Sequence, residues 1–134
     1  FEIQKPILLK IAPDLTYDQL DDVINLAIAI KLDGIVATNT TISRDGLSEK
    51  SKVKSQKIGN GGLSGKPLTQ RSTEIVKYIS QKTNGQIPII ASGGVFTAED
   101  AKEKFAAGAS LVQVWTGFIY EGPGIVKKIY KQLY

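Results

Sequence analysis

Residues 89–95 read IIASGGV, and residues 110–117 read SLVQVWTG. Each stretch begins as a short apolar run typical of a buried parallel strand, and each continues directly into small residues. The sequence between them predicts an amphipathic helix that begins at a Thr97 cap and stops at Gly108. A strand that ends in small residues exposes backbone N–H groups, which suit a phosphate. The two stretches therefore predict a βαβ unit with an anion-binding edge.

The rest of the chain repeats this alternation of strand and helix. Apolar runs predict four strands, at residues 7–11, 34–38, 87–91 and 111–114. Apolar residues at helical spacing predict helices after a Thr16 cap, around residues 75–79, after Thr97 and from Pro123 onward. Residues 39 to about 67 are predicted to be one long loop. Such alternation indicates a parallel sheet and the α/β class.

Polar or small residues follow each predicted strand, which favours a (β/α) barrel over an open doubly wound sheet, because barrels carry function on the C-terminal rim. No G-x-G-x-x-G pattern follows the first strand. A TIM barrel has eight units, so we expect residues 1–134 to form a half-barrel, (β/α)4. A lone half would expose two sheet edges, so an upstream half-barrel or a second copy is expected to complete it.

Composition excludes several kinds of chemistry. The 134 residues include no cysteine and no histidine, which removes thiol nucleophiles, imidazole bases, disulfides and the usual transition-metal clusters. The net charge is +4, and the lysines of residues 50–57 are interpreted as solvated surface rather than a nucleic-acid site. No apolar run is long enough to span a bilayer. The first residues lack signal-peptide features and suggest a chain entered in mid-sequence.

Three groups of residues are candidate ligand contacts. Lys10 is the only charge in the first predicted strand, so it is expected to face an anion or a cofactor unless it extends to solvent. Residues 38–41 read TNTT, which suits an amide, imide or carboxylate ligand but also fits a turn capped by asparagine. The glycine-dense residues 59–67 fit a ligand-binding loop or a merely flexible one. With Gly93-Gly94 and residues 115–117, they place three small-residue sites on consecutive loops.

Four segments resemble one family in order and spacing: LKIAPDL at 9–15, TNTT at 38–41, GGLSGKPL at 61–68 and GASLVQ at 108–113. They are similar to the C-terminal half of class 2 dihydroorotate dehydrogenases. The resemblance covers nearly the whole chain and implies a (β/α)8 barrel that binds FMN. It also implies oxidation of dihydroorotate to orotate in pyrimidine synthesis, with electrons passed to a membrane quinone.

The resemblance implies roles for ten residues. The FMN contacts would be Lys10, Thr38, Ser64, Gly65, Gly93, Gly94, Trp115 and Thr116, and the substrate contacts would be Asn39 and Thr40. Trp115 stands where many relatives carry tyrosine. In the family the catalytic base is a serine upstream of the matching region, and the quinone-binding part lies further upstream. The isolated chain is therefore expected to be inactive, and the whole enzyme is expected to be peripheral to a bacterial or mitochondrial inner membrane.

Two alternatives remain open at this stage. One is a flavin-free, phosphate-binding barrel that acts as an isomerase or a lyase. The other is a non-catalytic half-barrel that dimerises as a binding or folding module. Flavin absorbance separates the first alternative from the dehydrogenase, and sedimentation with and without the missing half separates the second.

Overall fold

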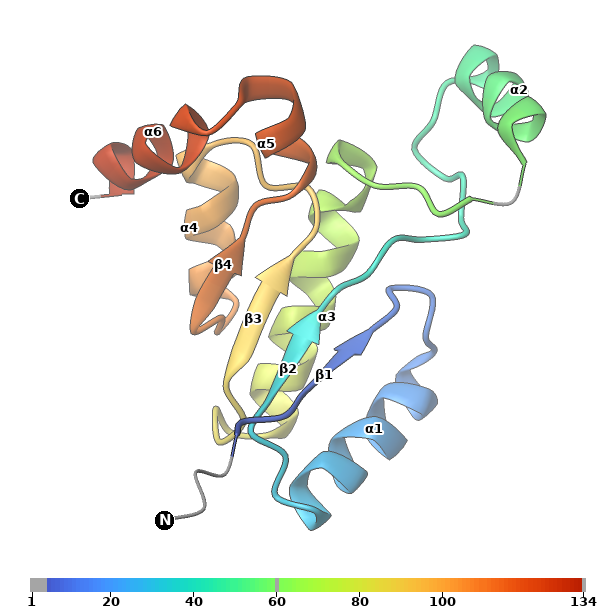
Figure 1. Cartoon of the computed structure of the whole chain (residues 1–134). Coiled ribbons are helices and arrows are strands. Elements are labelled where there is room, and N and C mark those ends of the chain that lie inside the picture. Colours follow the sequence, from blue (N-terminus) through green and yellow to red (C-terminus); the bar gives the residue numbers. More distant parts are fainter. Residues whose placement is uncertain (1–4, 60, 134) are drawn as a thin grey trace.

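The computed structural model describes residues 5–59 and 61–133 and contains one parallel sheet (Figure 1). Its strands are β1 (Leu8–Ile11), β2 (Gly34–Ala37), β3 (Ile89–Ser92) and β4 (Leu111–Gln113), in the spatial order β1-β2-β3-β4. The four predicted strands are confirmed, with ends that differ by one or two residues. In a doubly wound sheet the order of the strands reverses at a switch point, whereas the strands of a barrel follow one another in sequence order. The strands of this sheet follow sequence order.

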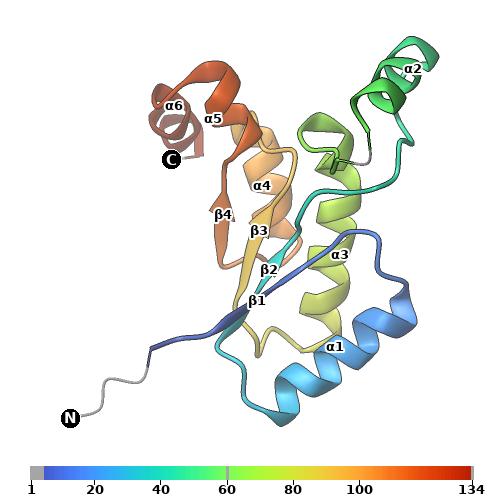
Figure 2. The same cartoon turned by 45° about the vertical axis from the view of Figure 1, so that its right-hand side comes forward.

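Four helices follow the four strands: α1 (Tyr17–Ala29), α3 (Thr69–Lys82), α4 (Ala98–Ala106) and α6 (Gly124–Leu133). The predicted caps are confirmed for α1 and α4, because Thr16 pairs with Gln19 and Thr97 pairs with Asp100 in reciprocal capping boxes. Figures 1 and 2 show α1, α3 and α4 on one side of the sheet. All carboxyl ends of the strands consequently point to the same edge.

The two faces of the sheet differ in burial. Ile11, Ala37 and Ala91 are register partners, and all three are buried in the main core against the helices. The next register layer, Lys10 and Leu111 among them, belongs to the opposite face, and Leu111 is 60% exposed. Among the described residues no helix covers this face (Figure 2). The sheet therefore has one face that is covered by helices and one face that the described residues leave uncovered.

The predicted loop from residue 39 to about 67 is wrong, because this segment contains the helix α2 (Glu49–Ile58) and the short 3-10 helix η1 (Lys66–Leu68). Ser48 caps α2 by accepting a hydrogen bond from the Ser51 N–H at 3.3 Å. Glutamate, lysine and glutamine favour helix without any apolar stripe. Periodicity alone could not reveal this helix, which stands away from the sheet (Figures 1 and 2).

A second short helix, α5 (Thr116–Glu121), begins directly after β4, where the sequence analysis expected only a loop. It leads into α6, which begins at Gly124 just after Pro123. A smaller core, separate from the main one, joins α4 to α6 through Ala101, Ile125 and Ile129. In the part of the chain that the structure describes, no helix has both the length and the apolar character needed to cross a membrane.

Candidate functional site

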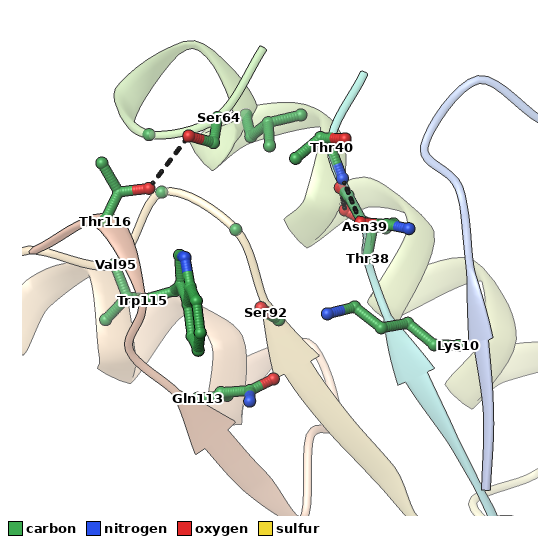
Figure 3. Close-up of a pocket in the computed structure, with 14 residues that line it drawn as sticks. Lys10, Thr38, Asn39, Thr40, Ser64, Ser92, Val95, Gln113, Trp115 and Thr116 are labelled. Carbon is green, nitrogen blue, oxygen red and sulfur yellow. Dashed lines mark hydrogen bonds between the residues drawn. The ribbon is translucent and has the colours of Figure 1, made fainter. Parts of the chain in front are cut away.

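A cavity of about 300 Å³ lies at the carboxyl ends of the four strands (Figure 3). All ten residues predicted as ligand contacts line it. Four further residues complete the lining: Leu68, Ser92, Val95 and Gln113. Since these residues range from Lys10 to Thr116 in the chain, their convergence depends on the sequential parallel sheet.

The turn after β3 is shaped by two glycines. Gly93 has a φ of +118° and Gly94 a φ of +72°, a region that side chains with a Cβ disfavour. A Cβ on Gly94 would lie 2.1 Å from Thr69 Oγ1 and 2.6 Å from the Thr69 backbone. The turn can therefore pack directly on the first residues of α3 only because both positions are glycine.

Side chains of α3 hold both carbonyls of this turn. Ser72 Oγ donates to the Gly93 carbonyl at 3.0 Å, and Thr69 Oγ1 donates to the Gly94 carbonyl at 2.8 Å. A trans peptide points its N–H opposite to its C=O, so the N–H groups of Gly94 and Val95 point away from α3. Among residues 5–59 and 61–133 these two N–H groups have no protein acceptor. The turn is therefore a preformed cradle for an anion.

The loop at residues 61–65 meets the start of α5 across the cavity. Thr116 Oγ1 donates to Ser64 Oγ at 3.1 Å, and a Cβ on Gly65 would lie 3.2 Å from Thr116 Cγ2. Trp115 is 69% exposed, and its ring stands at the cavity wall (Figure 3). The Ser64 and Thr116 hydroxyls therefore line the same cavity as the Gly93-Gly94 turn.

Lys10 supplies the positive charge of the cavity. Its side chain extends into the cavity from β1 (Figure 3), and within the described residues its ammonium group has no carboxylate or carbonyl partner. Gln113 is the polar residue of β4 and the register partner of buried Ser92. The sequence analysis missed Gln113, although a polar residue in an apolar strand is the same signal that selected Lys10.

The segment after β2 presents amide and hydroxyl groups. Asn39 N–H donates to the Ile11 carbonyl and Thr38 N–H to the Ser92 carbonyl, each at 2.7 Å, which fixes the start of the segment between its neighbouring strands. Asn39 Oδ1 accepts from the Thr40 N–H at 2.9 Å, but residues 38–40 form no turn, so the alternative of an asparagine-capped turn is wrong. The Asn39 amide nitrogen has no acceptor in the described chain and is available to a ligand.

The groups with shifted pKa values lie outside this cavity. On the outer surface, the Tyr78 hydroxyl and Lys82 both bond to Asp21 and lower the pKa of its carboxyl. Burial lowers the pKa of Lys104 on α4 to about 8. The described cavity lining therefore holds a cation, hydroxyls, amides and backbone donors, which suit binding, and no carboxylate to act as a general base.

Comparison with known proteins gives the family of the chain. The family model of dihydroorotate dehydrogenase matches residues 1–134. The chain belongs to the dihydroorotate dehydrogenase family. It is 57% identical over 129 residues to dihydroorotate dehydrogenase (quinone) of Christiangramia forsetii, which covers 96% of this chain and 36% of that protein. The corresponding enzyme of Trichodesmium erythraeum is 53% identical over 135 residues, which cover 98% of the chain and 36% of that protein.

The fold agrees with this family. A crystal structure of ligand-free dihydroorotate dehydrogenase from Eimeria tenella superposes with a TM-score of 0.88 at 43% identity, over 97% of this chain and 35% of that one. The resemblance to dihydroorotate dehydrogenases is confirmed, and the four parallel strands correspond to part of the family's barrel. The chain spans about a third of the length of these relatives. The roles of the ten individual residues stay predictions.

Proposed function

We propose that the chain is part of an FMN-dependent dihydroorotate dehydrogenase that oxidises dihydroorotate to orotate in pyrimidine biosynthesis, with a quinone as electron acceptor. One observation carries the proposal: the residues that the family resemblance assigns to FMN and substrate line a single cavity at the carboxyl ends of the strands. Membership of the quinone-type family supports the same reaction.

We further propose that residues 1–134 are the C-terminal half of a (β/α)8 barrel. The open sheet face and the edges at β1 and β4 are the surfaces that the first half of a barrel would cover. Leu111 at 60% exposure is an apolar side chain that such a cover would bury. The expected partners are therefore an N-terminal half-barrel and, through that part of the enzyme, a quinone and the membrane surface.

The residues of the cavity fit FMN. The unpaired N–H groups of Gly94 and Val95 form a cradle for a phosphate, and the Thr116 and Ser64 hydroxyls lie beside the adjoining loops. When bound, FMN supplies the two-electron acceptor for the substrate hydride and passes the electrons onward. The chain's own contribution is to bind the phosphate at one end of the cavity and to present a cation at the other.

Each remaining residue has a task that its chemistry allows. The Lys10 ammonium would stabilise negative charge on the pyrimidine edge of a bound flavin, and Thr38 would also contact the flavin. The Asn39 amide nitrogen and the Thr40 hydroxyl bind the polar groups of dihydroorotate. The family resemblance implies that the base is a serine upstream of the matching region, so we assign proton removal to the rest of the barrel and not to Ser64 or Ser92 of this cavity.

The test uses the full-length holoenzyme that contains this chain. Anaerobic addition of dihydroorotate is expected to bleach the bound flavin and release orotate, and a quinone analogue is expected to restore the colour. An Asn39→Ala variant is expected to keep its flavin but bleach far more slowly, while a surface variant such as Lys50→Ala behaves as the parent. A colourless protein, or a flavin that dihydroorotate does not reduce, would overturn the proposed function.

A further inference from the structure

Lys104 is a lysine buried at the outer side of the barrel wall, away from the cavity. Its side chain has no exposed surface, and its ammonium donates to three acceptors on the first turn of α3. These are the Thr69 carbonyl at 2.8 Å, Ser72 Oγ at 2.5 Å and Thr73 Oγ1 at 2.6 Å. An ammonium has three N–H donors, so this geometry uses all of them.

This geometry determines which way the neighbouring hydroxyls point. An ammonium only donates, so Ser72 Oγ accepts from Lys104 and must direct its own hydrogen elsewhere. The Gly93 carbonyl lies 3.0 Å from Ser72 Oγ, and the Thr69 carbonyl lies 3.2 Å away. A neutral amine would instead offer a lone pair that competes for this hydrogen. The charge on Lys104 thus favours the bond that holds Gly93.

We propose that Lys104 is a positioning residue for the anion-binding turn: through Ser72 it holds the Gly93 carbonyl against α3, so that the Gly94 N–H points at the FMN phosphate. This inference rests on the proposed FMN site and adds a residue that touches neither flavin nor substrate. It accounts for a charged side chain at a position where an apolar one of similar length would fill the same space.

The cost of that charge supports a role beyond packing. Burial disfavours the ammonium and lowers the Lys104 pKa to about 8, although the Asp100 and Glu103 carboxylates of the same helix oppose the shift. Replacing the ammonium by an apolar group relieves this desolvation cost but leaves Ser72 Oγ and Thr73 Oγ1 without its hydrogen bonds. A side chain that only filled this space would not need the charge.

The experiment compares two ligands that differ only in the phosphate. In the full-length enzyme stripped of flavin, the dissociation constants of FMN and riboflavin are measured by fluorescence quenching for the parent and for Lys104→Met. We expect Lys104→Met to weaken FMN by about tenfold, the scale of one lost hydrogen bond, while riboflavin affinity changes little. Equal weakening of both ligands, or no weakening, would overturn the inference.

A matched pair of variants keeps the test valid where Lys104→Met fails to fold. Ser72→Ala and Thr73→Val each remove one hydroxyl acceptor of the same ammonium, but only Ser72 contacts the turn. We expect Ser72→Ala to weaken FMN selectively and Thr73→Val to leave the ratio of FMN to riboflavin affinity unchanged. Identical ratios in the two variants would contradict a role for this chain of bonds. A parent protein that binds neither flavin would instead contradict the proposed function.

Discussion

Two loops that follow the neighbouring strands β2 and β3 line the cavity, and they are built in different ways. The turn after β3 is short, carries glycines at 93 and 94, and is fastened to α3 by the Ser72 and Thr69 hydroxyls. The segment after β2 is long and leaves the sheet to form α2 before it returns (Figure 1). The turn after β3 is held by hydrogen bonds to α3, whereas the segment after β2 is held mainly by hydrogen bonds between its own two ends.

The two ends of the segment after β2 are joined by a compact set of hydrogen bonds, which we call its base. Thr41 and Leu63 form an antiparallel bridge, with N–H to carbonyl distances of 3.0 and 2.8 Å. Arg44 donates to the Gly61 carbonyl at 2.6 Å, and Asp14 accepts from Thr41 Oγ1 at 2.5 Å. Asn39 and Thr40, the proposed substrate contacts, precede the bridge, and α2 lies beyond it. The comparison predicts that loosening this base disturbs the segment after β2 but leaves the Gly93-Gly94 turn in place on α3.

Gly94→Ala should give the largest effect, because it combines a positive φ with a collision against the α3 backbone. We expect a loss of about 4 kcal/mol in the free energy of unfolding and no measurable FMN binding. Gly85→Ala is the matched control, since Gly85 has a φ of +70° but nothing within 4 Å of its Cβ position. It should lose only about 1 kcal/mol. Equal losses would show that the contact with α3 is unimportant.

The pH dependence of stability should reveal Lys104. Its folded pKa of about 8 lies below the unfolded value of 10.5, so the unfolded state binds more protons between them. The contribution of Lys104 to the free energy of unfolding should therefore rise from about pH 8 to about pH 10.5, by about 3 kcal/mol in total. Denaturant unfolding of the parent and Lys104→Met across this range measures the difference. Parallel curves would mean that the buried group does not titrate there.

Arg44→Ala should affect the segment after β2 and leave the Gly93-Gly94 turn unchanged. Loss of its bonds to the Gly61 carbonyl and to three carbonyls at residues 41–43 should cost about 1 to 2 kcal/mol in local stability. We expect the KM for dihydroorotate to rise, while the ratio of FMN to riboflavin affinity, which reports on the Gly93-Gly94 turn, stays the same. Lys52→Ala is the control, because Lys52 pairs only with Glu49 within α2. A change in that ratio would mean that the two loops are coupled.

Val53→Ser should give the smallest effect. Val53 is 55% exposed on α2, which stands away from the sheet. We expect the free energy of unfolding to change by no more than about 0.5 kcal/mol. The KM for dihydroorotate and the affinity for FMN should both match those of the parent. A larger loss of stability would indicate that another part of the enzyme covers this helix.

The difference between the two loops also explains which features of the fold and the site could be predicted from the sequence. The Gly93-Gly94 turn was predictable, because paired glycines after an apolar strand have a direct backbone consequence. Both capping boxes were predictable, since Thr16 and Gln19, like Thr97 and Asp100, act over three residues. Lys10 was selected by its charge in an apolar strand. All these signals are local.

The missed features depend on distant or weak signals. The helix α2 has no apolar stripe, and α5 begins at residues whose small size suggested a loop. Lys104 lies in a lysine-rich, apparently exposed helix, yet its three acceptors are 31 to 35 residues away along the chain. Burial of that ammonium follows from packing α4 on α3, which no local pattern records.

A crystal structure of the full-length enzyme with FMN bound tests the central claim most directly. The account predicts that the phosphate accepts hydrogen bonds from the Gly94 and Val95 N–H groups, with Thr116 beside it and Lys10 at the pyrimidine end of the ring. It would be contradicted by an FMN phosphate bound elsewhere, with those two N–H groups satisfied by protein atoms.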